Sequence, residues 1–192
     1  MNRSLMIICT LLLALPILSQ VVFASGLEDI SNYRQYSPTF ASAGQPSADQ
    51  LELIASSGVE RVIYLAFTDN ETAIEDEDRT VKSLGMEYVH IPVDFDKPTL
   101  IDFHYFAAVM QSSPEKKTLL HCQINLRASA FSFLYRVIHL DVPMENAIED
   151  LQGVWAPNED WYLFIKKVLA DHNLNINCDA CDWGASDFTD NA

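Results

Sequence analysis

The sequence predicts a single α/β domain in which helices flank a central, mostly parallel β-sheet. Short apolar, β-branched runs typical of buried strands alternate along the chain with longer segments that have helical features. The length of 192 residues suits one domain with a sizeable core. The composition, 49% hydrophobic and 20% charged, is that of an ordinary globular protein. In such sheets ligands bind beyond the carboxyl ends of the strands, so those ends are where we look for a site.

The first half of the chain supplies the first strands and helices. Residues 25–38 are polar and mixed, and we expect an irregular segment there. Ser47 has the features of a helix N-cap, and Gly58 is a helix stop signal. The elements expected in this half are a strand at 40–43, a helix at 47–57, a strand at 60–67, an acidic helix at 70–84 and a strand at 87–92.

The second half continues the alternation after an aspartate-rich loop at 94–98. A short apolar strand at 117–121 runs directly into Cys122. The segment after it, 127–140, is apolar over most of its girth, which predicts a buried helix. The other helices expected here are 99–111, 143–151 and 159–171.

The N-terminal 24 residues have the features of a secretory signal peptide. Arg3 precedes a nearly unbroken apolar run, and Val22-Phe23-Ala24 places small residues where a signal peptidase reads. The run is too short for a membrane anchor, and no second apolar run of spanning length follows. We therefore expect removal of residues 1–24, a domain at 25–172, an acidic tail at 173–192, export to a bacterial periplasm, and no membrane contact after cleavage.

The acidic net charge excludes some classes of binding partner. The net charge is −15, and loss of Arg3 with the signal peptide would make it −16. Nucleic-acid binding needs clusters of Lys and Arg, so the sequence argues against it. The acidic surface should mildly repel large anionic substrates, although salt screens the repulsion beyond about 8–10 Å. We expect a small anionic substrate.

Three cysteines remain once Cys9 leaves with the signal peptide. Cys178 and Cys181 form a CxxC, whose neighbours Asp179 and Asp182 oppose the thiolate that a redox motif needs. A zinc site would need four ligands, which this stretch does not offer. In an oxidising compartment the simplest arrangement is a Cys178–Cys181 disulfide and a free Cys122.

The segment from His121 to Ser129 combines the features of a nucleophile and an anion cradle. Main-chain N–H groups of a tight loop can surround an anion, and the N-terminus of the following helix adds partial positive charge. Arg127 can close over the anion, and the same field favours the thiolate of Cys122. Ser129 could donate a hydrogen bond to that sulfur, and His121 could order the loop. The remaining loop residues are Gln123, Ile124, Asn125 and Leu126.

Two further inferences concern residues around this segment. The loop contains no glycine, and Asn125 is the residue best suited to a left-handed backbone conformation. The other histidines, His90, His104, His139 and His172, are scattered and show no metal-ligand spacing. We therefore predict no metal site and no cofactor.

At His121-Cys122, Arg127 and Ser129 the sequence resembles the cysteine-dependent protein tyrosine phosphatase superfamily. It is most similar to the bacterial, dual-specificity-phosphatase-like branch often described as beta-lactamase-hydrolase-like phosphatases. Segments 43–47, 58–65 and 85–93 also fit that branch in order, and the resemblance covers about residues 40–170. It implies the cysteine-phosphatase fold, with Cys122 as nucleophile, Arg127 as anion clamp and Asp94 or Asp96 as the acid, with a slight preference for Asp96.

One departure from the pattern leaves alternatives open. Most phosphatases of this type have five residues between the cysteine and the arginine, whereas four separate Cys122 from Arg127. That spacing is also typical of rhodanese-type sulfurtransferases, which would use a Cys122 persulfide. The leading prediction is hydrolysis of phosphate monoesters through a cysteinyl-phosphate. The alternatives are sulfur transfer and a non-catalytic oxyanion-binding module. The small anionic substrate is accordingly expected to be either a phosphate ester or a sulfane-sulfur donor.

Overall fold

A five-stranded sheet forms the centre of the computed structural model, which describes residues 26–178, 181 and 183. The strand order is β1-β2-β5-β3-β4. β1 pairs antiparallel with β2, and the other neighbours are parallel. The predicted fold class is therefore confirmed. The strands are β1 (Arg34–Ser37), β2 (Phe40–Ala43), β3 (Arg61–Tyr64), β4 (Glu87–His90) and β5 (Thr118–His121).

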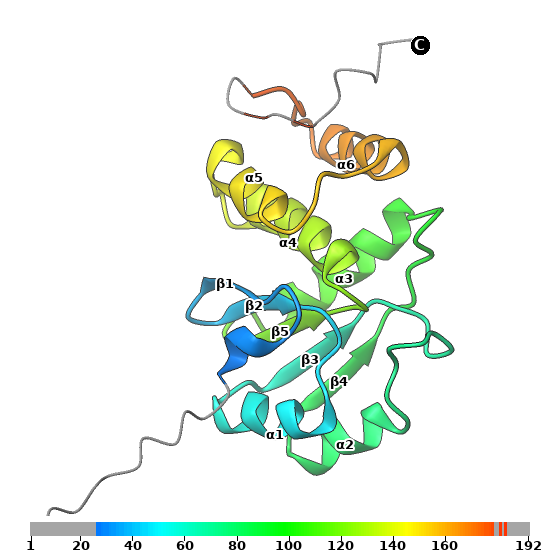
Figure 1. Ribbon diagram of the computed structural model, residues 1–192. Coiled ribbons are helices and arrows are strands. Elements are labelled where there is room, and N and C mark those ends of the chain that lie inside the picture. The colour runs from blue at the N-terminus through cyan, green and yellow to red at the C-terminus, as the bar shows by residue number, and fades with distance from the viewer. Residues whose placement is uncertain (1–25, 179–180, 182, 184–192) are drawn as a thin grey trace, which may run out of the picture.

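Helices cover both faces of the sheet (Figure 1). α1 and α2 lie on one face, and the larger group from α3 to α6 lies on the other. Side chains alternate along the central strands, so Val62 and Leu119 join the core under α1 and α2, while Ile63 and Leu120 join the other core. The helices are η1 (Leu27–Asp29, a 3-10 turn), α1 (Ala48–Ser56), α2 (Glu77–Ser83), α3 (Leu100–Ser112), α4 (Leu126–His139), α5 (Met144–Gln152) and α6 (Glu159–Asp171).

Two segments differ from the expectation. The lead-in at 25–38 was expected to be irregular, yet it contains β1, which pairs with β2 at the sheet edge. The acidic helix expected over 70–84 exists only as α2, and residues before it form turns. Asn70 stabilises a turn at the start of this segment, because its side chain accepts the N–H of Thr72 and donates to the hydroxyl of Tyr64.

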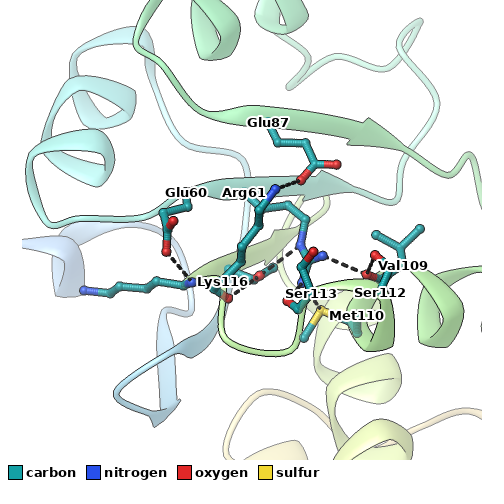
Figure 2. Close-up of polar contacts among 10 residues, drawn as sticks. Glu60, Arg61, Glu87, Val109, Met110, Ser112, Ser113 and Lys116 are labelled. Atoms are coloured by element: carbon teal, nitrogen blue, oxygen red, sulfur yellow. Dashed lines mark hydrogen bonds and ion pairs between the residues drawn. The ribbon is translucent and has the colours of Figure 1, made fainter.

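Arg61 joins the sheet to the end of α3, although it is fully buried and belongs to no salt bridge among the described residues. Its guanidinium donates to the carbonyl oxygens of Val109 (2.7 Å) and Ser113 (3.4 Å), and to the hydroxyl of Thr118 (3.0 Å). Figure 2 shows this arrangement. Burial lowers the pKa of Arg61, and nearby acidic groups, Glu87 first, oppose the shift.

The ends of the chain lie mostly outside the described residues. The expected signal peptide at 1–24 is among the residues that the structure does not describe, as is most of the tail beyond 178. Cys178 and Cys181 form a disulfide, and Trp183 packs against Phe133 and Tyr162. In the described part of the chain, no helix combines the length and apolar character that a membrane span requires.

Candidate active site

Cys122 lies at the carboxyl edge of the sheet, between the end of β5 and the start of α4. Its side chain is 1% exposed and its thiol is free. The Cys122 N–H donates to the carbonyl oxygen of Ala43 at the end of β2 (3.3 Å). The cysteine is therefore fixed where two central strands end, which is the edge at which parallel sheets bind ligands.

Asn125 makes the turn that connects the cysteine to α4. Its φ of 72° is left-handed, as the sequence predicted. The Asn125 side-chain amide donates to the carbonyl oxygen of Asn32 (2.6 Å), and the Asn32 amide donates to the carbonyl oxygen of Ile124 (2.9 Å). These reciprocal bonds hold the loop against the segment that precedes β1.

The loop has free main-chain donors. Among the described residues, the N–H groups of Gln123, Ile124, Leu126 and Arg127 donate to no main-chain carbonyl. The N-terminus of α4 adds its partial positive charge at the same place. This combination of donors and helix dipole suits an oxyanion.

Arg127 adds a full positive charge to the loop. It is 6% exposed, and both terminal nitrogens contact the side-chain oxygen of Gln123, at 3.2 and 3.3 Å. The guanidinium carbon lies 5.3 Å from the centre of the Phe95 ring. No carboxylate pairs with Arg127 in the described part of the chain. Its charge is therefore held by neutral groups and is available to an anion.

A cavity of about 230 Å³ brings these groups together. One part of its wall consists of Cys122, the loop after it and Arg127. Phe95 and Thr72 come from two other loops and form the rest. The complete lining is Thr72, Phe95, Cys122, Gln123, Ile124, Leu126 and Arg127.

His121, the last residue of β5, is held in place by a stack of rings next to the Cys122 loop. It is fully buried, and its ring stacks on Tyr64 at 4.7 Å, which in turn stacks on His90 at 5.2 Å. His121 Nε2 lies 3.1 Å from Glu77 Oε1, an electrostatic contact whose angles do not meet those of a hydrogen bond. Burial raises the pKa of Tyr64, which keeps the phenol protonated as a donor to the Phe67 carbonyl. The stack crosses β5, β3 and β4 and fixes the residue next to Cys122.

Asp94 and Asp96 flank Phe95 in the loop between β4 and α3, and both are exposed. Asp94 Oδ1 accepts the N–H of Asp96 (3.0 Å), whereas no hydrogen bond to the Asp96 carboxylate is found among the described residues. The Phe95 carbonyl accepts the indole N–H of Trp161 from α6 (2.9 Å). The loop therefore brings both aspartates beside the cavity, but neither forms its wall.

Ser129 lies in the first turn of α4 and is buried. Its hydroxyl donates to the carbonyl oxygen of Leu126 (3.0 Å). In this structure Ser129 therefore stabilises the start of the helix, and the hydrogen bond to sulfur expected from the sequence is not formed.

Comparison with known proteins agrees with this geometry. Residues 12–153 match the family model described as "DSP-PTPase phosphatase fused to NAD+ Kinase". A DUF442 protein from Shewanella putrefaciens CN-32, described as a candidate phosphatase, is 33% identical, with a TM-score of 0.70 over 76% of this chain and 96% of its own. The chain belongs to the DSP-PTPase family. A search of curated proteins finds no match.

More distant solved structures share the fold with this DSP-PTPase chain. Tk-PTP in its active form is 17% identical, with a TM-score of 0.62 over 71% of this chain and 95% of its own. A cysteine-to-serine variant of Pseudomonas aeruginosa TpbA, solved in complex with phosphotyrosine, is 18% identical, with a TM-score of 0.60 over 77% and 90%. At these identities the likeness concerns the fold alone.

The DSP-PTPase site also contains residues that sequence reasoning missed. Thr72 and Phe95 line the cavity, Glu77 contacts His121, and Asn32 holds the loop. No local pattern marks them, because each comes from a different part of the chain. Gly44 belongs to the 43–47 segment that fits the family, and the structure gives a reason for glycine there: a Cβ would lie 2.9 Å from the Gln123 carbonyl oxygen and 3.1 Å from Ile124 Cα.

Proposed function

We propose that this protein hydrolyses phosphate monoesters through a cysteinyl-phosphate on Cys122. The observation that supports this most strongly is the cavity itself. The same small space is lined by a buried free cysteine, a buried arginine and a loop; among the described residues the arginine has no carboxylate partner and the loop has N–H groups that bond to no main-chain carbonyl. The thiolate is the nucleophile, and the positive field of Arg127 and the loop N–H groups suits the three oxygens of a phosphoryl group.

The proposed reaction has two steps. The Cys122 sulfur attacks phosphorus, the S–P bond forms, and the P–O bond to the leaving group breaks as an acid protonates that oxygen. Arg127 and the loop N–H groups hold the three remaining phosphoryl oxygens. Water then attacks phosphorus and gives a proton to the carboxylate that had served as the acid, the S–P bond breaks, and inorganic phosphate and the cysteine thiolate are released.

Asp96 is the acid that we propose for the first step. Its carboxylate makes no hydrogen bond among the described residues, whereas that of Asp94 is engaged by the Asp96 N–H. Phe95 lies between them in the chain and lines the cavity, so this loop places Asp96 one residue from the cavity wall.

An aryl phosphate is the substrate class that fits best. The Phe95 ring forms part of the cavity wall and could pack against an aromatic leaving group. The phosphotyrosine bound to TpbA, a protein of the same fold, supports this choice.

Hydrolysis of an aryl phosphate by single variants tests the proposal. Cys122→Ser should abolish turnover, and Asp96→Asn should lower kcat by about 10²–10⁴-fold, with Asp94→Asn as the matched control. Arg127→Ala should weaken phosphate binding.

A large loss of kcat in Asp94→Asn alone would transfer the acid role to Asp94. A Cys122 persulfide formed from thiosulfate, without release of aryl alcohol, would instead favour sulfur transfer.

The proposed cellular location is the bacterial periplasm. The features of residues 1–24 support export, and the Cys178–Cys181 disulfide agrees with an oxidising compartment.

A further inference from the structure

Three side chains with metal-ligating groups meet where α3 packs against the end of α6. They are His104 from α3, Asp171 from the last turn of α6, and His172, which caps that helix. One ligand atom from each lies within 4.8 Å of the other two. None of the three lines the Cys122 cavity, so the cluster is separate from the proposed chemistry.

We propose that this cluster binds a divalent transition-metal ion of the zinc class. Imidazole nitrogen and carboxylate oxygen are ligands that Zn²⁺ prefers. Tetrahedral zinc with bonds of about 2.0–2.1 Å places its ligand atoms roughly 3.3 Å apart. The ligand atoms, now within 4.8 Å of one another, therefore need to close in by at most about 1.5 Å, and a water molecule would complete the coordination.

Part of this arrangement is already in place. His104 Nε2 lies 2.9 Å from Asp171 Oδ2, and their side chains are 47% and 41% exposed, so an ion can reach them from solvent. The main-chain N–H of His172 bonds within the last turn of α6, which fixes the position of that residue. The C-terminal end of α6 carries partial negative charge, which favours a cation.

A second observation points to a ligand at the same place. His172 Nε2 is buried and has no hydrogen-bond partner among the described residues. The same holds for Nε2 of His139, whose ring lies 5.5 Å from that of His172 and whose Nδ1 contacts Gln111 (2.8 Å). Buried polar atoms normally have partners, and a bound ion would supply one for His172.

The sequence did not indicate this site because its ligands come from distant segments. His104 and Asp171 are 67 residues apart, and the scattered histidines show no metal-ligand spacing. Only the packing of α3 against α6 brings them together. Asp171 and His172 are adjacent in the chain, but two neighbouring ligands carry no recognisable motif.

Zinc titration of the full chain carrying Cys9→Ser and Cys122→Ser tests this proposal. These substitutions remove the two thiols outside the disulfide, which would compete for the ion. Calorimetry without reductant should show one Zn²⁺ per chain, and saturating Zn²⁺ should raise the Tm. His104→Gln and His172→Gln should each weaken binding at least about tenfold and remove the Tm increase.

His90→Gln is the matched control, because His90 lines a separate acidic cavity with Glu77 and Asp78. Its zinc affinity should equal that of the parent. Because His104 is half exposed, its substitution should leave the fold intact, and the Tm measured without metal checks this. Absence of zinc binding, or binding that persists in His104→Gln and His172→Gln, would overturn the proposal. Loss in His90→Gln alone would place the ion in the acidic cavity instead and would equally overturn it.

Discussion

Asn125 has two separable roles in the loop that follows Cys122. Its backbone takes a left-handed conformation, and its side chain bonds to the Asn32 carbonyl. The first role suits Asn or Gly, while the second needs the amide. The loop geometry, and with it the row of N–H donors, depends on both.

Asn125→Gly and Asn125→Ala should separate these roles. Glycine keeps the left-handed backbone and loses only the hydrogen bond, at a cost of about 1 kcal/mol in the free energy of unfolding. Alanine loses both, for roughly 1–2 kcal/mol more, and should reduce kcat/KM for an aryl phosphate further than glycine does. Urea denaturation and steady-state kinetics measure the two effects. Equal losses in the two variants would show that the backbone conformation is unimportant.

At the scale of single elements, the end of α3 depends on a buried arginine. Arg61 donates to the carbonyls of Val109 in the last turn of α3 and of Ser113, which caps the helix (Figure 2). Lys116 lies nearby and forms a half-exposed ion pair with Glu87. Substituting Arg61 and Lys116 in turn therefore compares what a buried and an exposed interaction contribute to the free energy of unfolding.

Arg61→Met should lower the free energy of unfolding by about 2–4 kcal/mol, because the buried hydrogen bonds of a charged donor to Val109, Ser113 and Thr118 are lost. Lys116→Met should cost at most about 1 kcal/mol, as exposed ion pairs do. KM for an aryl phosphate should change little in either, since neither residue lines the cavity. Denaturation midpoints give the comparison, and equal stability of the two variants would contradict this view of Arg61.

The elements also show where sequence patterns fail. The buried character of α4 was predicted because nearly its whole girth is apolar, and Arg127 to Arg136 are indeed all buried. The segment before α2 was misread as helix because acidic residues suit both a helix face and a turn. The turn in this segment is stabilised by hydrogen bonds of the Asn70 side chain to Thr72 and Tyr64. The bond to Tyr64 forms only in the folded chain.

At the scale of the whole molecule, the sequence predicted the order of the main strands and helices, and the position of Cys122 beyond a strand. Those features follow from local apolar patterns and cap residues such as Ser47, whose capping box the structure contains. The partners that complete the site could not be predicted. Phe95, Glu77 and Asn32 reach it through contacts made only by folding.

Export is a property of the whole chain and has a direct test. Protein recovered from the periplasmic fraction of a bacterial host should begin at Ser25, after cleavage behind Ala24. Its mass without reductant should show the Cys178–Cys181 disulfide as a loss of two hydrogens. Recovery of the uncleaved chain from the cytoplasm, with both thiols reduced, would contradict the proposed location.

The central claim is that Cys122 carries the phosphoryl group during turnover. The most direct measurement is intact-mass and peptide mass spectrometry after rapid mixing with an aryl phosphate and an acid quench. We expect one added phosphoryl group on the peptide that contains Cys122, formed as aryl alcohol is released and absent from Cys122→Ser. Release of aryl alcohol that persists in Cys122→Ser, with no adduct on the cysteine, would contradict the claim.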